Sequence, residues 1–253
     1  MRATLTLVRR EFSAYFLSPI GYVVFAVFLA VTGYLFFLSL DLLTANGPRG
    51  ISFPMQLMVN NVFWLVFLFI PPLLTMRLFA EERSTGTLET LLTAPLRDWQ
   101  IVLSKFFACY LFYVCLWIPT LLYLPVLLDF NFKTFTAGFD PWPAVTTYVG
   151  LMLAGAMFLS IGLLISSLVK TPMVAALLSL FVSLLFILAG FWRPDMDTSG
   201  AGYRLLFFFT VPLHFERNFA RGLIDTRQLV LYASLTLFCL FLTVRSLESR
   251  RWR

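Results

Sequence analysis

The sequence has little charge for its length and almost no histidine or cysteine. Only 13% of its 253 residues are Asp, Glu, Lys or Arg, whereas 60% are hydrophobic. A soluble domain has about 25% charged and about 45–50% apolar residues. A core surrounded by water would need more polar surface than this chain can supply, so the composition indicates a membrane protein.

Motifs for independent chemistry are also missing. The sequence has no G-x-x-x-x-G-K-[ST] phosphate loop, so the chain is not expected to hydrolyse ATP by itself. It has no H-E-x-x-H motif, and His214 is its only histidine. A Ser–His or Cys–His mechanism would need that one residue. His214 could therefore be structural or interfacial, or it could have a catalytic or metal-binding role. The sequence also has no basic stripe of the kind that would indicate nucleic-acid binding.

The three cysteines, Cys109, Cys115 and Cys239, lie inside apolar runs without metal-ligand spacing. Such cysteines are expected to pack inside helices, and they predict neither a disulfide framework nor a metal site. The first apolar run starts late and is too long for a cleavable signal peptide. We therefore expect no metal or other cofactor in this chain and no cleaved leader.

Six runs of the sequence lack charged residues. A helix needs about 20 residues to cross a bilayer, with a range of about 17–25. The sequence therefore predicts an all-α polytopic membrane protein with six transmembrane helices, within the runs 12–40, 50–76, 106–128, 141–169, 171–192 and 228–244. Lys170 and Thr171-Pro172 predict a tight turn between two spans, since proline is tolerated at a helix start. The absence of charge inside the spans disfavours a proton-driven carrier.

Positive charge is distributed unequally between the two sides of this arrangement. Six crossings put both termini on one side, and the segments of that side carry 12 of the 19 Lys and Arg residues. Cytoplasmic flanks of membrane proteins collect Lys and Arg. We therefore expect both termini in the cytoplasm, a bacterial inner-membrane location, and a single transmembrane domain over residues 1–253.

Residues 1–18 have the pattern of an interfacial helix. Apolar residues recur on one helical face, at Leu5, Val8, Phe12 and Phe16. Three arginines can face the lipid headgroups, and Ser18-Pro19 resembles a helix cap and first turn. The segment is predicted to be an amphipathic elbow helix on the membrane, with a disordered basic tail as the alternative.

Two further segments lie outside the predicted spans. The inner segment 78–99 is amphipathic, and Pro95 is expected to end its helix; its charges could instead form only a solvated face. The outer segment 193–227 contains nine apolar residues, 205–213, which Pro212 is expected to break. These nine residues are too few to span. They could form a re-entrant or interfacial element, or pack on the outer ends of the spans.

The segment that begins at Phe79 closely resembles the cytoplasmic signature of ABC exporter permeases of the second class. In that family the pattern Glu-x-x-x-Gly-Thr-x-Glu-x-Leu-Leu-x-x-Pro follows the second span. The matching residues here are Glu82, Gly86, Thr87, Glu89, Leu91, Leu92 and Pro95. Residues 10–22 and 219–227 resemble the gliding-motility-type branch, and the overall resemblance covers essentially the full chain.

The resemblance implies a permease that pairs with a second copy or a homologue and carries cytoplasmic ABC ATPase subunits, which would bind ATP and Mg²⁺. It implies a coupling helix over 81–97 seated in a groove of the ATPase, with the N-terminal helix as a second contact. The candidate coupling residues are Glu81, Glu82, Arg83, Gly86, Thr87, Glu89, Leu92, Pro95 and Arg97.

Three functions remain open at this point. The first is an ATP-driven permease, whose uncharged and aromatic spans would suit an amphiphilic or lipid-linked substrate, although those aromatic residues could equally pack against lipid or a second copy. The second is a non-transporting scaffold that transmits ATPase motion to a periplasmic partner through residues 193–227. The third, an intramembrane enzyme, would depend on His214.

Overall fold

Helices make up almost all of the chain that the structure describes. The structure is a computed structural model, and it describes residues 2–46, 61–87, 97–123, 125–126, 142–188 and 208–251. The α-helices are α1 (Arg2–Leu17), α2 (Pro19–Asn46), α4 (Asn61–Thr75), α5 (Ala80–Ser84), α7 (Asp98–Trp117), α9 (Trp142–Leu168), α10 (Pro172–Leu188), α12 (Val211–Arg217) and α13 (Thr226–Arg251). Two short 3-10 helices are η1 (Pro119–Leu122) and η2 (Phe219–Arg221). The predicted all-α class is confirmed.

Four helical segments are long and apolar enough to cross a membrane: Pro19–Asp41, Asp98–Leu122, Trp142–Leu168 and Thr226–Ser249. The apolar helices α4 and α10 are shorter, at 15 and 17 residues. Each of the six predicted runs thus overlaps one of these helices, but a total of six crossings stays a prediction.

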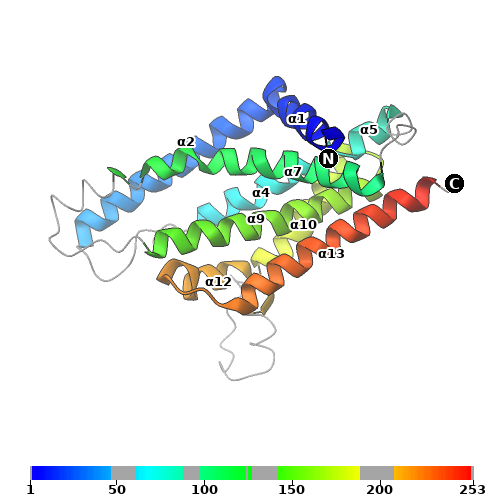
Figure 1. The fold of residues 1–253 in the computed structure, drawn as a ribbon. Helices are drawn as coiled ribbons and strands as arrows, with labels where there is room; N and C mark the ends of the chain where they lie inside the picture. The colour runs from blue at the N-terminus through cyan, green and yellow to red at the C-terminus, as the bar shows by residue number, and fades with distance from the viewer. Residues whose placement is uncertain are drawn as a thin grey trace.

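Helix α9 lies at the centre of the bundle. It packs along α13 over most of its length, and it also contacts α4, α7 and α10. Helix α1 packs across α7, and Figure 1 shows both chain termini at the end of the bundle where α5 lies. The interior is aromatic, with Trp64 of α4 against Phe215 and Phe67 against Phe158 of α9. Edge-to-face rings of this kind fill a core without polar atoms.

Small residues of α9 allow neighbouring helices to approach closely. A Cβ atom added at Gly155 would overlap the ring of Tyr113, and one added at Gly162 would overlap Thr75. Tyr113 in turn donates a hydrogen bond through its hydroxyl to the Leu151 carbonyl, at 3.0 Å. Because membrane helices gain little from the hydrophobic effect among themselves, such close contacts are a main source of their association.

Two predicted chain breaks are present. Helix α1 ends at Leu17 and α2 begins at Pro19, so the break falls at Ser18 as expected. Helix α9 ends at Leu168 and α10 begins at Pro172, which confirms the tight turn around Lys170. Whether α1 lies on a membrane surface stays a prediction.

The outer segment is described only from residue 208. Pro212 lies in the first turn of α12 and so begins a helix, which differs from the expected break. A proline is favourable there because the first N–H groups of a helix have no intrahelical partner. Phe215 and Phe219 are buried against Gly150 of α9. The described part of the segment therefore packs on the end of the helical bundle.

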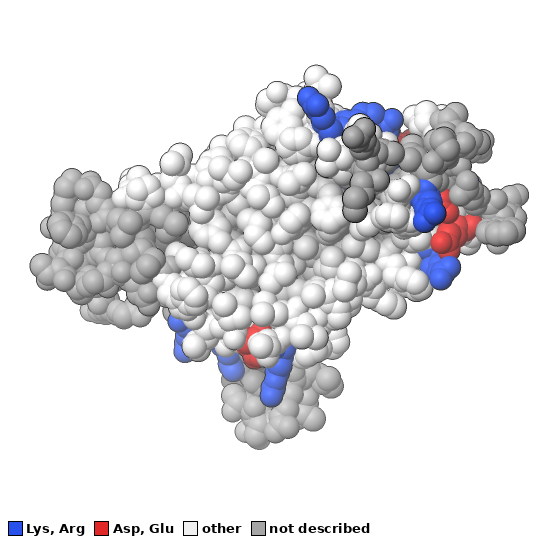
Figure 2. All heavy atoms as spheres, viewed as in Figure 1, with Lys and Arg blue, Asp and Glu red and all other residues white. Residues whose placement is uncertain are grey.

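Charged side chains occupy two separate zones of the surface. Figure 2 shows Lys, Arg, Asp and Glu at the end with the termini and again below, with uncharged surface between them. The lower zone corresponds to α12, η2 and the start of α13, which carry Arg217, Arg221 and Arg227, respectively. An uncharged band between two charged zones is the surface expected of a protein in a bilayer.

Candidate functional site

The candidate site is the junction at which α5 meets α1, α7 and α9. Helix α5 begins at Ala80, directly after the turn that follows α4. The backbone N–H groups of Phe79 and Ala80 both donate to Ser166 Oγ of α9, each at 3.1 Å. The first N–H groups of a helix need an outside acceptor. Ser166 supplies it and attaches the start of α5 to the end of α9.

Arg83 makes a second attachment to the same end of α9. Its guanidinium donates to the Leu168 carbonyl at 2.9 Å. The last carbonyls of a helix are unpaired and carry the negative end of the helix dipole, so a cation is favourable at this place. The two attachments fix both the start and the end of α5 relative to α9.

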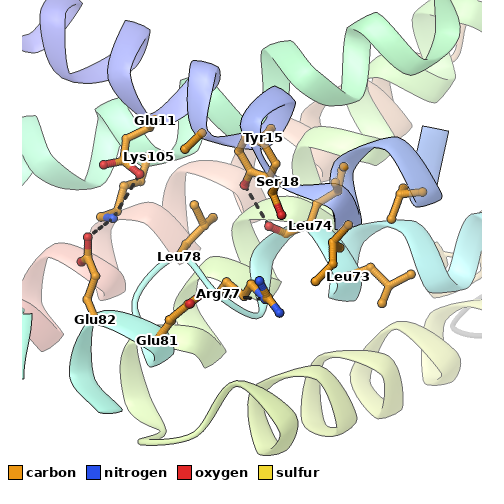
Figure 3. Close-up of a pocket in the computed structure, with 14 residues that line it drawn as sticks. Glu11, Tyr15, Ser18, Leu73, Leu74, Arg77, Leu78, Glu81, Glu82 and Lys105 are labelled. Carbon is orange, nitrogen blue, oxygen red and sulfur yellow. Dashed lines mark hydrogen bonds and ion pairs between the residues drawn. The ribbon is translucent and has the colours of Figure 1, made fainter. Parts of the chain in front are cut away.

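Lys105 connects α5 with α7 and α1. Its Nζ atom is 2.6 Å from Glu82 Oε1 and 3.5 Å from Glu11 Oε2 (Figure 3). Only 1% of the lysine side chain is exposed, against 21% for Glu82 and 14% for Glu11. A buried ammonium group is tolerated only when it is paired. Three helices that are distant in sequence are thus held by one buried cation.

Glu82 is the incompletely paired member of this cluster. Arg10 Nη2 lies 2.7 Å from Glu11 Oε1 and shares that carboxylate with Lys105, whereas Glu82 Oε2 is buried without a hydrogen-bond partner. Burial raises the pKa of Glu82 above its ordinary value of 4.5; the attraction of Lys105 opposes this shift, and the charge of Glu11 adds to it. A change in pH is therefore expected to act on this junction through the protonation of Glu82.

Aromatic side chains complete the contact between α1 and the bundle. Tyr15 stacks on Phe112 of α7 with ring centroids 4.9 Å apart, and its hydroxyl donates to the Leu74 carbonyl of α4 at 2.9 Å. Phe79 lies beneath the Lys105 ammonium, which is 5.3 Å from the ring centroid. The N-terminal helix is consequently attached to both α4 and α7.

Beyond α5 the chain turns sharply. The helix ends at Ser84, and Gly86 has a φ angle of 76°, in the left-handed region that favours glycine. The Thr85 and Thr87 hydroxyls are 2.9 Å apart, and Thr85 also donates to the Glu81 carbonyl. Among the described residues, nothing lies within 4 Å of a Cβ atom built on Gly86. The turn therefore faces open space.

The predicted coupling residues fall into three groups. Glu81, Glu82 and Arg83 lie on α5, Gly86 and Thr87 lie in the turn, and Arg97 is exposed before the first turn of α7. Glu89, Leu92 and Pro95 lie outside the described residues, and so does the predicted helix end at Pro95. One helix over 81–97 is not what the described part shows, because the backbone of Gly86 interrupts it.

Residues outside the predicted coupling set complete the junction. Lys105 and Glu11 were recognisable as charges that border long apolar runs and belong to the segments resembling the family, but their pairing was not predicted, and nothing in the sequence distinguishes Ser166. Helix α7 starts at Asp98, well before its apolar run, so Lys105 lies two turns inside a helix and not at its edge. The isolated lysine among apolar residues was the one usable signal.

The remaining chemical candidates lie elsewhere. His214 is 1% exposed, and its Nδ1 atom is 2.8 Å from the Tyr232 hydroxyl, so it belongs to the packing between α12 and α13. Cys109 and Cys239 are buried and Cys115 is half-buried, all as free thiols. Among the described residues, no cluster of His, Cys, Asp and Glu could hold a metal ion.

Comparison with known proteins identifies the family. The sequence model for the ABC-2 family transporter protein matches residues 13–244, which is most of the chain. A search of curated proteins finds no match. Members of this family are the membrane subunits of ABC transporters and pair with a separate ATPase subunit. The chain therefore belongs to the ABC-2 transporter family and is a multi-pass membrane permease subunit of an ABC transporter.

Proposed function

We propose that α5 and the turn after it receive the motion of a cytoplasmic ABC ATPase, and that the junction around Lys105 passes this motion into the bundle. The observation that carries the proposal is the set of attachments of one five-residue helix to α9 through Ser166 and Arg83 and to α7 and α1 through Lys105. An element held at several points moves its neighbours when it moves, which is the requirement for mechanical coupling.

The same contacts support an orientation. Lys105 joins α1, α5 and α7 at one end of the bundle, which favours placing the N-terminus and α5 on the same side of the membrane. In that arrangement both α2 and α4 would cross the membrane. We propose six crossings within one domain over residues 1–253, with both termini in the cytoplasm of a bacterial inner membrane.

The partners follow from this assignment. A second copy of the chain or a homologue would complete the permease, and two ATPase subunits would bind ATP and Mg²⁺. Candidate contacts with the ATPase are Gly86, Thr87, Arg97 and, beyond the described residues, Glu89, Leu92 and Pro95. Glu82 and Arg83 act inside the permease, because both are engaged with α7 and α9.

The experiment is co-purification with the cognate ATPase in mild detergent, with ATP hydrolysis assayed on the eluate. Gly86→Trp would fill the open space in front of the turn, and Arg97→Glu would reverse an exposed charge before α7. Both variants should lose the ATPase. Arg245→Glu, a matched reversal of another exposed arginine near the C-terminus, should retain it. Equal recovery of the ATPase by all three variants would refute the coupling assignment.

The uncharged surface of the bundle favours an amphiphilic substrate. Apolar side chains of α2, α10 and α13 are left exposed, among them Phe37, Phe181 and Phe238. An uncharged surface of this kind suits movement of an amphiphilic substrate. Phe112 and Tyr113 are buried in the bundle and so pack inside it, without lining a pathway.

A mechanical role is the second candidate. Leu223 and Ile224 are exposed beside η2, at the end of the bundle away from α5. Two adjacent exposed apolar residues on a folded outer element favour contact with another protein. ATP hydrolysis that rises with an outer protein but with no tested amphiphile would favour this role over transport.

A further inference from the structure

A cavity of about 310 Å³ lies where α1, α2, α4, α5 and α7 meet. Figure 3 shows its lining, with Glu11, Glu82 and Lys105 on one side and Arg77 and Glu81 below. The other lining is apolar and includes Ile20, Val24 and Leu73. Small-molecule sites have volumes of about 300–1,000 Å³. This cavity therefore has room for a polar headgroup and its first carbons, and not for a whole lipid.

The cavity lies at the border between charged and uncharged surface. It adjoins Tyr15 and Ser18 at the end of α1, close to the start of α2. In the proposed orientation this is the depth of the headgroups of the cytoplasmic leaflet. A ligand with one polar and one apolar part would fit such a lining better than a fully soluble molecule would.

The charges of the lining have both signs and are incompletely paired. Arg77 Nε lies 3.7 Å from Glu81 Oε2, and the two side chains are about half exposed. That distance is longer than a hydrogen bond, so each partner can exchange the other for a ligand group. Lys105, by contrast, is engaged by two carboxylates. Arg77 is therefore the cation of the lining best placed to bind an anion.

The carboxylates favour a ligand that also donates hydrogen bonds. Three of them line the cavity, Glu11, Glu81 and Glu82. Glu11 is paired with Arg10 at 2.7 Å, whereas Glu82 Oε2 lacks any hydrogen-bond partner and Glu81 lies 3.7 Å from Arg77. A purely anionic headgroup could bind Arg77 but would supply no cation to Glu81 and Glu82. A quaternary ammonium group has no N–H to donate, whereas a primary ammonium group has three.

We propose that the cavity binds the headgroup of a zwitterionic phospholipid that carries a primary amine. Its phosphate binds Arg77, its ammonium group binds Glu81 and Glu82, and the first carbons of its tails lie against Leu73 and Val24. A lipid held between α1 and the end of α4 would stabilise the junction from the membrane side. The binding itself does not depend on an ATPase, so it can fail or succeed independently of the coupling proposal.

The experiment is native mass spectrometry of the full chain in detergent, after addition of phosphatidylethanolamine, phosphatidylcholine or phosphatidylglycerol. The wild type should retain phosphatidylethanolamine about tenfold more strongly than the other two, because only that headgroup offers a cationic N–H donor to the carboxylates. The double variant Arg77→Gln/Glu81→Gln should lose this preference. The matched variant Arg245→Gln/Glu248→Gln removes an exposed ion pair at the same end of the bundle but outside the cavity, and it should keep the preference.

Equal retention of the three lipids by the wild type, or equal loss in both double variants, would overturn the proposal and indicate nonspecific lipid. A second variant distinguishes loss of the binding site from misfolding. Ala14→Trp fills the cavity from α1 without changing charge. Selective loss of phosphatidylethanolamine from a variant with wild-type thermal stability supports the site. Retention at the wild-type level by a folded Ala14→Trp protein with a filled cavity would refute it.

Discussion

At Lys105 a single ammonium group is buried between carboxylates from two other helices. Its burial is almost complete, while Glu11 and Glu82 keep some contact with solvent. Taking charges out of water is costly, and only the partners repay that cost. The cluster is therefore more sensitive to loss of one member than to neutral replacement of a pair.

Replacement of Lys105 by Met should destabilise the protein by about 2–3 kcal/mol, less than the ~3–5 kcal/mol for a fully buried pair because both carboxylates are partly exposed. Thermal unfolding in detergent measures the effect. Adding Glu82→Gln to Lys105→Met should restore part of the loss, since an uncompensated carboxylate is then removed. A double variant that is no more stable than Lys105→Met would show that the carboxylates are not the cause.

The raised pKa of Glu82 predicts a pH dependence. In the unfolded chain this carboxyl group loses its proton near pH 4.5, and in the folded protein it does so at a higher pH. Between the two values the folded state binds more protons, so the stability contributed by this group falls as the pH rises. The difference in Tm between wild type and Glu82→Gln should decline across that window and be constant above it.

The attraction of Lys105 lowers the pKa of Glu82, so removal of Lys105 tests the assignment. In a Lys105→Met background, the decline of the Tm difference produced by the Glu82→Gln change should extend to higher pH. A wild-type curve parallel to that of Glu82→Gln at every pH above 4.5 would contradict the assignment.

At the scale of elements, the contact between α9 and α7 depends on a glycine, Gly155, which has no side chain. Gly155 faces the ring of Tyr113, whose hydroxyl is bonded to α9 one turn earlier. Gly155→Leu should separate the helices and cost about 1–3 kcal/mol, as overpacking does. Thermal unfolding checks this prediction.

Gly33→Ala is the matched control on α2. A Cβ atom there would be 3.5 Å from the Tyr123 hydroxyl, an ordinary contact. Alanine also has the higher helix propensity, so this variant should be as stable as the wild type or more stable. Similar destabilisation by Gly33→Ala would mean that close packing at Gly155 is not the reason for its effect.

At the scale of the whole molecule, the charged zones and the position of α5 predict the sidedness of the chain. Single cysteines at Ser13, Ser84 and Thr171 in a cysteine-free background should react with an impermeant maleimide from the cytoplasmic side. A cysteine at Leu223 should react from the opposite side. All four native side chains are exposed. If α4 and α10 did not cross, Ser84 and Thr171 would instead be labelled together with Leu223.

The sequence by itself determined the class of the protein, its helices and two of its turns. In a bilayer, a long uncharged run must form all of its backbone hydrogen bonds within the protein. A single run can do so only as a helix. Pro19 and Pro172 marked helix starts because proline is best tolerated in the first turn of a helix, although Pro71 and Pro72 lie inside α4. The family pattern from Glu82 to Pro95 could also be read directly.

Only the tertiary structure decided how α5 is held. Glu11, Glu82 and Lys105 are far apart in sequence, and their meeting depends on the way α1 crosses α7. Ser166 resembles any other serine of an apolar helix until the start of α5 is placed beside it. Hydrophobic periodicity specifies which residues turn away from water, but it does not specify which helices meet. The contacts between distant charges follow from that choice of neighbours.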